Sequence, residues 1–125
     1  MGKMKNWWKY SGILLIATGI IHSIVGLVMG CDVYWEILKS GFVNAIEPHF
    51  AVDFAAFWFF ICGIILIIFG QTLHYYIRKT KQPAPLLSGY WMLALSIFGC
   101  IAMPLSGIWL FIPQALLIIF AKRIK

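Results

Sequence analysis

Charged side chains are scarce in this sequence, and acidic ones are scarcest of all. Only 11% of the 125 residues are charged, 62% are hydrophobic, and four are Asp or Glu. Soluble domains carry roughly a quarter charged residues, and a water-soluble fold of this length could not bury so much apolar surface. The composition therefore excludes an ordinary soluble domain and predicts a membrane protein.

Cysteine is also rare. Cys31, Cys62 and Cys100 lie far apart with no CxxC spacing, which indicates neither a disulfide framework nor a zinc cluster. The start MGKMKN lacks the Ser or Thr of a myristoylation motif at its sixth position. The first apolar run is too long for the core of a signal peptide, so we expect this segment to be retained.

Long apolar runs are what the sequence has in abundance. Four of them approach the length that a helix needs to cross a bilayer, and lipid offers backbone amides no partners outside a helix. The expected fold class is all-α, a four-transmembrane-helix bundle forming a single integral membrane domain over residues 1–125. The predicted spans are about residues 10–29, 52–75, 86–103 and 105–121.

The basic residues orient this predicted bundle. Nine of the ten lie at the two ends of the chain or between the second and third spans: Lys3, Lys5, Lys9, Arg78, Lys79, Lys81, Lys122, Arg123 and Lys125. The positive-inside rule then places both termini in the cytoplasm. All four acids fall on the opposite side: Asp32, Glu36, Glu47 and Asp53. The net charge of +6 is explained by topology and by the lipid bilayer as partner, with no nucleic acid involved.

Small residues recur at helical spacing in the first two spans. Gly12, Gly19 and Gly26 are seven residues apart, as are Ala56, Gly63 and Gly70. Such spacing lets backbones approach closely, which is how membrane helices gain packing energy. We expect the two seams to pack on each other. Packing within one chain and packing between two copies, as a homodimer, both remain open.

The first seam locates a polar layer. His22 follows Gly19 by three residues, so it shares the same helix face and points into the bundle. At a rise of about 1.5 Å per residue, His22 lies roughly 10 Å below the outer surface. Ser96 in the third span and Gln114 in the fourth come out at a similar depth. We expect these three side chains to form one layer of hydrogen-bonding groups.

Two further features concern the helix ends. The segment CDVYWEILKSGF, residues 31–42, is typical of a short amphipathic helix on the outer membrane surface. Asp32 is its expected N-cap, and Gly41 is expected to end it. Pro113 is expected in the middle of the fourth helix, where it would kink the helix and free the carbonyl of Trp109.

The stretch NAIEPHFAVD, residues 44–53, collects scarce ionisable groups. If the second helix begins at Pro48, where a missing N–H costs nothing, His49 and Asp53 fall on the same stripe as Gly63. With Glu47 they would form a rim above the polar layer. The aromatic run Phe57–Phe60 is expected to face lipid.

The resulting hypothesis is an outward-opening intramembrane pocket that binds a small lipophilic ligand. Its candidate ligand-binding residues are His22, Ser96 and Gln114 below, with Glu47, His49 and Asp53 at the rim. A structural role for His22, as a hydrogen-bonding group between helices, stays open beside this hypothesis.

Other functions are open as well. A membrane enzyme could use His22 or His49 as an acid–base group, with Glu47 or Asp53 as its partner, on a lipid-soluble substrate. Its catalytic residues and any cofactor are unknown. A metal or haem site is a weaker alternative, with His22, His49 and Asp53 as metal ligands. A small multidrug transporter is disfavoured, because the first helix has no carboxylate.

Several stretches carry a family resemblance: WWKYSGILLIATGIIHSIVG, FWFFICGIILIIFG, HYYIRKTKQPAP and MPLSGIWLFIPQALLII. In these the chain resembles a family of small bacterial four-helix integral membrane proteins known only as a domain of unknown function. The resemblance implies the four-helix topology and the bacterial cytoplasmic (inner) membrane, and it brings no activity with it. A looser similarity extends to DoxX-like and sterol-isomerase-type four-helix proteins, without a motif that carries their catalytic residues.

Overall fold

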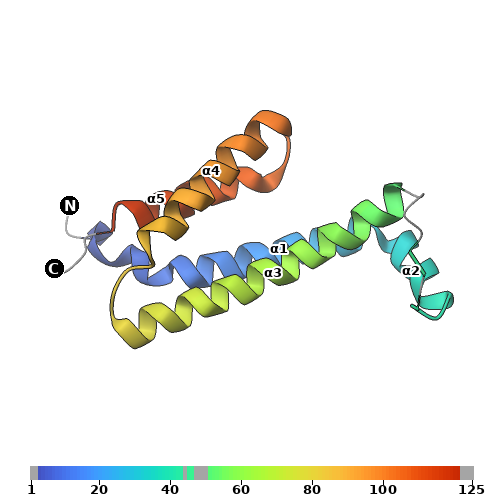
Figure 1. Ribbon diagram of the computed structural model, residues 1–125, viewed down its shortest axis with the longest axis horizontal. Coiled ribbons are helices and arrows are strands. Elements are labelled where there is room, and N and C mark those ends of the chain that lie inside the picture. The colour runs from blue at the N-terminus through green and yellow to red at the C-terminus, as the bar shows by residue number, and fades with distance from the viewer. Residues whose placement is uncertain (1–2, 44, 47–50, 122–125) are drawn as a thin grey trace. The chain divides into compact units, whose positions relative to one another are not determined.

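Helices form all the regular secondary structure in a computed structural model of the chain, which describes residues 3–43, 45–46 and 51–121. This confirms the all-α class for those residues. The α-helices are α1 (Ser11–Met29), α2 (Cys31–Lys39), α3 (Ala51–Thr80), α4 (Leu86–Ala102) and α5 (Phe111–Ile119) (Figure 1). Two 3-10 segments, η1 (Lys3–Tyr10) and η2 (Gly107–Leu110), precede α1 and α5.

Internal contacts divide the chain into two units. Unit 1 comprises residues 1–16 and 69–125, and unit 2 comprises residues 17–68. Helices α1 and α3 each pass through both units. Most of the buried hydrophobic side chains among the described residues, such as Leu15, Ile77 and Ile118, belong to unit 1.

Two helical stretches are long and apolar enough to cross a membrane, judged by length and composition. They are Asn6–Met29 and Ala51–Thr80, and they match the first two predicted spans. The third and fourth predicted spans are helical but shorter, since α4 has 17 residues and α5 has 9. The structure therefore shows helix in each predicted span, and the four-helix membrane bundle and the number of membrane crossings stay predictions.

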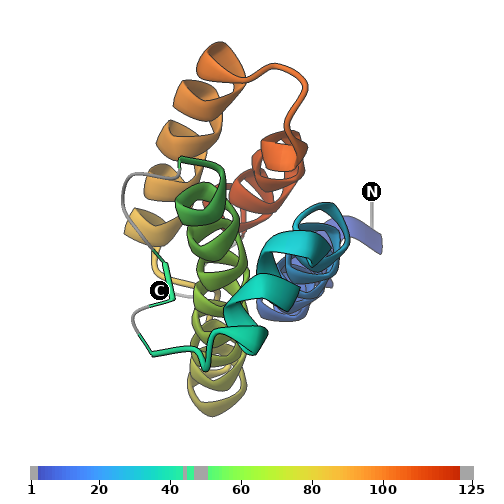
Figure 2. The ribbon, with the colours of Figure 1, turned by 90° about the vertical axis from the view of Figure 1, so that its right-hand side faces the viewer.

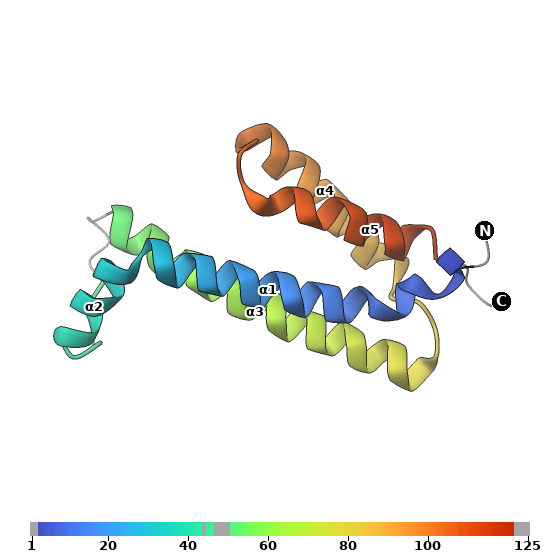
Figure 3. The same ribbon diagram turned by 180° about the vertical axis from the view of Figure 1, so that it is seen from behind.

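The two glycine seams pack on each other, as the sequence predicted (Figures 1 and 3). In unit 2, a Cβ atom added to Gly19 would lie 2.8 Å from the carbonyl oxygen of Gly63. In unit 1, a Cβ atom added to Gly70 would lie 2.9 Å from the carbonyl oxygen of Gly12. These backbones touch directly, so the seams are used within the chain.

Helix α2 begins almost where α1 ends. Gly30 alone separates them, and its amide donates to the carbonyl of Gly26 at 2.9 Å. Figures 1 and 2 show α2 running in a different direction from α1. Gly30 is the N-cap, with no side-chain capping hydrogen bond, so the expectation that Asp32 caps α2 is wrong. Asp32 instead lies in the first turn, where its charge faces the positive end of the helix dipole.

Gly41 ends α2 as predicted. Its φ is +86°, a left-handed conformation that glycine adopts without strain. The amide of Gly41 donates to Leu38 at 3.2 Å, and the amide of Phe42 donates to Ile37 at 3.0 Å. This pair of bonds is a Schellman motif, which satisfies the last carbonyls of the helix.

The prediction for Pro113 is wrong in one respect. Residues 107–110 form the 3-10 segment, and α5 begins only at Phe111, so Pro113 lies in the first turn of α5 and not in its middle. An amide in the first turn has no partner within the helix, and proline is tolerated there. The carbonyl of Trp109 accepts the amide of Phe111, so it is not left free.

Candidate functional site

An apolar groove lies in unit 2 where α1 ends and where α2 and α3 begin. Its volume is about 200 Å³. Glycine and alanine form much of its wall, and none of the described residues that line it is charged. The lining residues are Gly26, Met29, Gly30, Val33, Val52, Ala55, Ala56 and Phe59. The small side chains keep this space open, because larger ones would fill it.

His22 stands one turn before Gly26 on the same face of α1 and packs against α3. Its imidazole stacks on the ring of Phe59, with centroids 3.9 Å apart and planes 13° from parallel. Phe59 lines the groove, so the histidine is directly behind one wall. The structure shows this face of α1 in contact with α3, and the place of His22 inside a four-helix bundle stays a prediction. Phe59 departs from the expected lipid-facing orientation of its aromatic run, because its ring contacts α1.

Two polar atoms of α1 are buried about one turn from this groove, in residues that do not line it. His22 Nε2 and Ser23 Oγ have no hydrogen-bond partner among the residues that the structure describes. Buried polar atoms in folded proteins nearly always have a partner, since an unmet donor or acceptor costs about 1–3 kcal/mol. The two atoms therefore call for a group that can hydrogen-bond to them.

Helix α2 is held against α3 by Tyr34. The phenol donates a hydrogen bond of 2.6 Å to the carbonyl oxygen of Ala56. Its ring also meets Phe60 edge-on, with centroids 5.9 Å apart. Burial raises the pKa of the Tyr34 phenol above its ordinary value. Ala56 lines the groove, so this hydrogen bond fixes α2 beside it.

The predicted rim is only partly described. Asp53 is half-buried in the first turn of α3, while Glu47, Pro48 and His49 lie outside the described residues. Asp53 precedes Phe59 by six residues, which is about 9 Å along a helix, so the structure does not pair it directly with His22. Within the described ranges no three His, Cys, Asp or Glu side chains form a metal-binding group. The alternative set of His22, His49 and Asp53 stays a prediction.

Ser96 and Gln114 belong to unit 1, where α4 and α5 pack side by side (Figures 1 and 3). Both are buried, with 0% and 6% of their surface exposed. The hydroxyl of Ser96 donates to the carbonyl oxygen of Met92 at 2.6 Å, within its own helix. The structure thus places these two residues in one unit and His22 in the other, and their shared polar layer stays a prediction.

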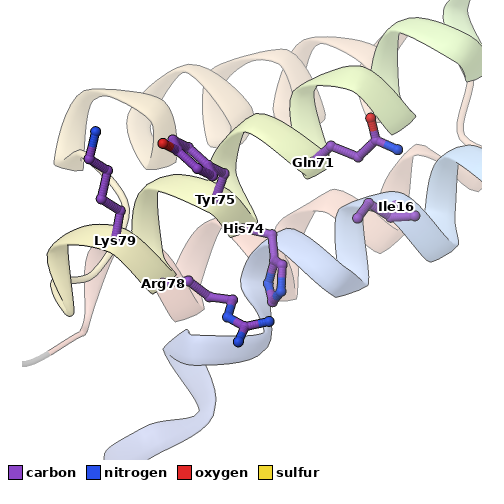
Figure 4. A pocket seen from close by; sticks show the side chains of 6 residues that line it. All are labelled: Ile16, Gln71, His74, Tyr75, Arg78 and Lys79. Atoms are coloured by element: carbon purple, nitrogen blue, oxygen red, sulfur yellow. The ribbon is translucent and has the colours of Figure 1, made fainter.

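A second hollow, of about 470 Å³, was not predicted from the sequence. It lies in unit 1 along the last turns of α3 (Figure 4), and its lining residues are Ile16, Gln71, His74, Tyr75, Arg78 and Lys79. The five α3 residues are spaced by three, four, seven and eight positions from Gln71, which is one face of a helix. That spacing is visible in the sequence, where Arg78 and Lys79 were interpreted only as residues that orient the helices in the membrane.

Comparison with known proteins gives a family and no function. No curated protein matches the chain. No solved structure matches it either. A family profile matches residues 6–125, nearly the whole sequence. The chain therefore belongs to DUF6463, a family of unknown function.

Proposed function

We propose that this protein is an integral membrane protein that binds a small lipophilic molecule in the groove of unit 2. The observation that carries the proposal is the combination of an apolar groove with the buried, unmet polar atoms of His22 and Ser23 about one turn from it on α1. Binding sites for small molecules combine apolar walls with a few polar groups that fix the ligand's orientation.

Membrane insertion is supported by the surfaces of the helices. In the stretch Ala51–Thr80, only 6% of the most apolar window is buried within the chain. Helix α4 carries a continuous exposed apolar stripe, formed by Leu87, Trp91, Leu95, Phe98 and Ile101. Exposed apolar patches of this extent are unfavourable in water and suit contact with lipid.

We further infer four membrane crossings, with both termini in the cytoplasm of a bacterial cell and the protein in the inner membrane. The distribution of basic residues supports this orientation. In it the groove of unit 2 opens toward the outer surface. Helix α2, whose Trp35 and Leu38 are exposed, then lies on that surface beside the groove.

The groove limits the ligand's chemistry. An apolar cavity of about 150 Å³ is enough to hold benzene, so about 200 Å³ suits a ring or a short branched chain, with any longer part extending into lipid. Because His22 lies behind Phe59 and does not line the groove, a hydroxyl or carbonyl group on the ligand reaches the imidazole in this proposal by displacing the Phe59 ring. In this proposal Ser96, Gln114, Glu47 and His49 remain candidate contacts for the rest of the molecule.

Binding is favoured over catalysis by one distance. In the enzyme alternative a carboxylate acts as the partner of the histidine, and a direct pair of this kind needs hydrogen-bond contact. The nearest carboxylate along α3 that the structure describes is Asp53, about 9 Å from the level of His22. No specific observation among the described residues favours a second function.

The proposal is tested by filling the groove. Ala55 lines the groove and is otherwise exposed, so Ala55→Leu should occupy the space without disturbing the glycine seam. Native mass spectrometry and organic extraction of gently purified protein should detect a bound small molecule in wild type. We expect Ala55→Leu to lose at least about 90% of it, because an overfilled cavity excludes its ligand. Ala51→Leu, on the same helix but outside the groove, should retain it.

A second pair of variants tests the role of His22. His22→Ala should lower occupancy roughly tenfold, the usual effect of losing one buried hydrogen bond, and His22→Gln should restore part of it. If wild type carries no small molecule, or if His22→Ala lowers thermal stability without changing occupancy, the histidine is a structural group and the binding proposal is wrong.

A further inference from the structure

The hollow at the end of α3 in unit 1 has the chemistry of an anion site. Arg78 and Lys79 are exposed at the end of the helix, and Lys79 Nζ lies 5.6 Å from the centroid of the Tyr75 ring. His74 and Arg78 extend toward α1, whereas Tyr75 and Lys79 lie along the other edge of α3 (Figure 4). The hollow thus has a cation on each edge.

The floor of this hollow adds both an apolar and a polar element. Ile16 of α1 lines it. His74 Nδ1 is buried there and has no hydrogen-bond partner within the described ranges of the chain. Gln71 and Tyr75 supply further hydrogen-bonding groups. A ligand that fits would carry a compact anionic group and an apolar portion next to it.

The charge balance of the chain leaves these cations without a carboxylate in their own unit. Unit 1 contains nine of the ten Lys and Arg residues and no Asp or Glu, because all four acids lie between residues 32 and 53. The negative end of the α3 dipole attracts Arg78 and Lys79. It does not account for the hollow between them or for the buried nitrogen of His74.

We propose that this hollow binds the phosphate group of an anionic phospholipid. Arg78, with its planar fork of donors, and Lys79 pair with the phosphate oxygens, and Ile16 contacts the start of an acyl chain. The inference rests on the proposed membrane orientation, which puts this end of α3 at the cytoplasmic leaflet. Basic hollows between membrane helices on that side are suited to anionic headgroups.

Native mass spectrometry of the detergent-purified protein, titrated with phosphatidylglycerol or phosphatidylcholine, tests this. We expect phosphatidylglycerol to bind at least about tenfold more tightly, and each lost charge to weaken it about fivefold. Arg78→Gln and Lys79→Gln should therefore each lose affinity, and the double variant should lose most. Lys79→Arg, which keeps the charge, should bind as wild type does.

The matched control is Lys81→Gln. Lys81 is exposed in the same segment but does not line the hollow, so its loss should change affinity less than about twofold. Equal losses for Lys81→Gln and Arg78→Gln would reduce the effect to general surface charge and overturn the site. Equal binding of phosphatidylcholine would overturn the choice of an anionic lipid.

Inorganic phosphate separates the two sources of a phosphate group. If it displaces phosphatidylglycerol at similar concentrations, the hollow takes free phosphate and the lipid proposal fails. The same spectra report the molecule proposed for the groove of unit 2. We expect its occupancy to be unchanged in Arg78→Gln, so that either proposal can fail while the other stands.

Discussion

A single methyl group decides whether α1 and α3 can pack as they do. A Cβ atom added at Gly63 would overlap Ser23 Oγ and would lie 3.0 Å from the amide nitrogen of Ser23. Backbone cannot move aside as a flexible side chain can, so we expect Gly63→Ala to lower the free energy of unfolding by about 1–3 kcal/mol. Reversible unfolding in mixed detergent micelles would measure this.

Gly107 provides the matched control, because a Cβ atom there would meet nothing within 4 Å. Gly107→Ala should change the free energy of unfolding by less than about 0.5 kcal/mol. Equal losses in the two variants would mean that the helix contact at Gly63 is not as close as described.

Part of the contact between α1 and α3 could be predicted from the identity of its residues. Glycine at seven-residue spacing has few explanations in an apolar helix other than close packing, so the contact between the two seams could be predicted from the sequence. The stacking of His22 on Phe59 could not. Four aromatic residues in a row, Phe57–Phe60, have no periodicity that tells which ring faces a neighbouring helix, and only the packed structure selects one.

At the level of elements, α2 depends on Tyr34 for its position against α3. Tyr34→Phe removes the hydrogen bond to Ala56 and keeps most of the ring contact with Phe60. We expect a loss of about 0.5–1.5 kcal/mol in local stability. Hydrogen exchange should show faster exchange of the α2 amides with little change in α4. Trp35→Phe is the control on the same helix, since Trp35 is exposed.

The same contact has a pH dependence. Burial raises the folded-state pKa of Tyr34 above the unfolded value of about 10. The contribution of the phenol is therefore fully present below the unfolded pKa and is lost as the pH rises through the folded pKa. We expect the α2 amides of wild type to lose protection at alkaline pH, after correction for the base-catalysed rise in the intrinsic exchange rate. In Tyr34→Phe the protection of these amides should not change with pH in this way. Identical profiles in both would rule out the docking role.

Helix boundaries were the least predictable part of the elements. The end of α2 followed from Gly41, because a left-handed residue after a helix favours glycine. The start of α5 did not follow from Pro113. The same proline is compatible with a kink inside a long helix and with the first turn of a short one, and the 3-10 geometry of residues 107–110 decides between them.

Over the whole molecule, charge is segregated along the sequence, with nine of the ten basic residues in unit 1 and all four acidic residues in unit 2. This pattern predicted an orientation in the membrane. It does not determine whether the hairpin formed by α4 and α5 crosses the membrane. A helix of 17 residues is about 25 Å long, slightly less than the hydrocarbon core. A spanning hairpin and one that re-enters from the cytoplasm would leave both termini on the same side.

Leu105, fully exposed at the bend of that hairpin, distinguishes the two arrangements. In a cysteine-free background, Leu105→Cys should react with a membrane-impermeant maleimide added to intact spheroplasts. A variant that retains only Cys31 is the positive control and should react in the same way. Lys81→Cys should react only after permeabilisation, because the positive-inside rule keeps it in the cytoplasm. Four crossings require the first pattern. If Leu105→Cys behaves like Lys81→Cys, only α1 and α3 cross, and the hairpin lies on the cytoplasmic side, where its apolar stripe would face the same leaflet as Arg78.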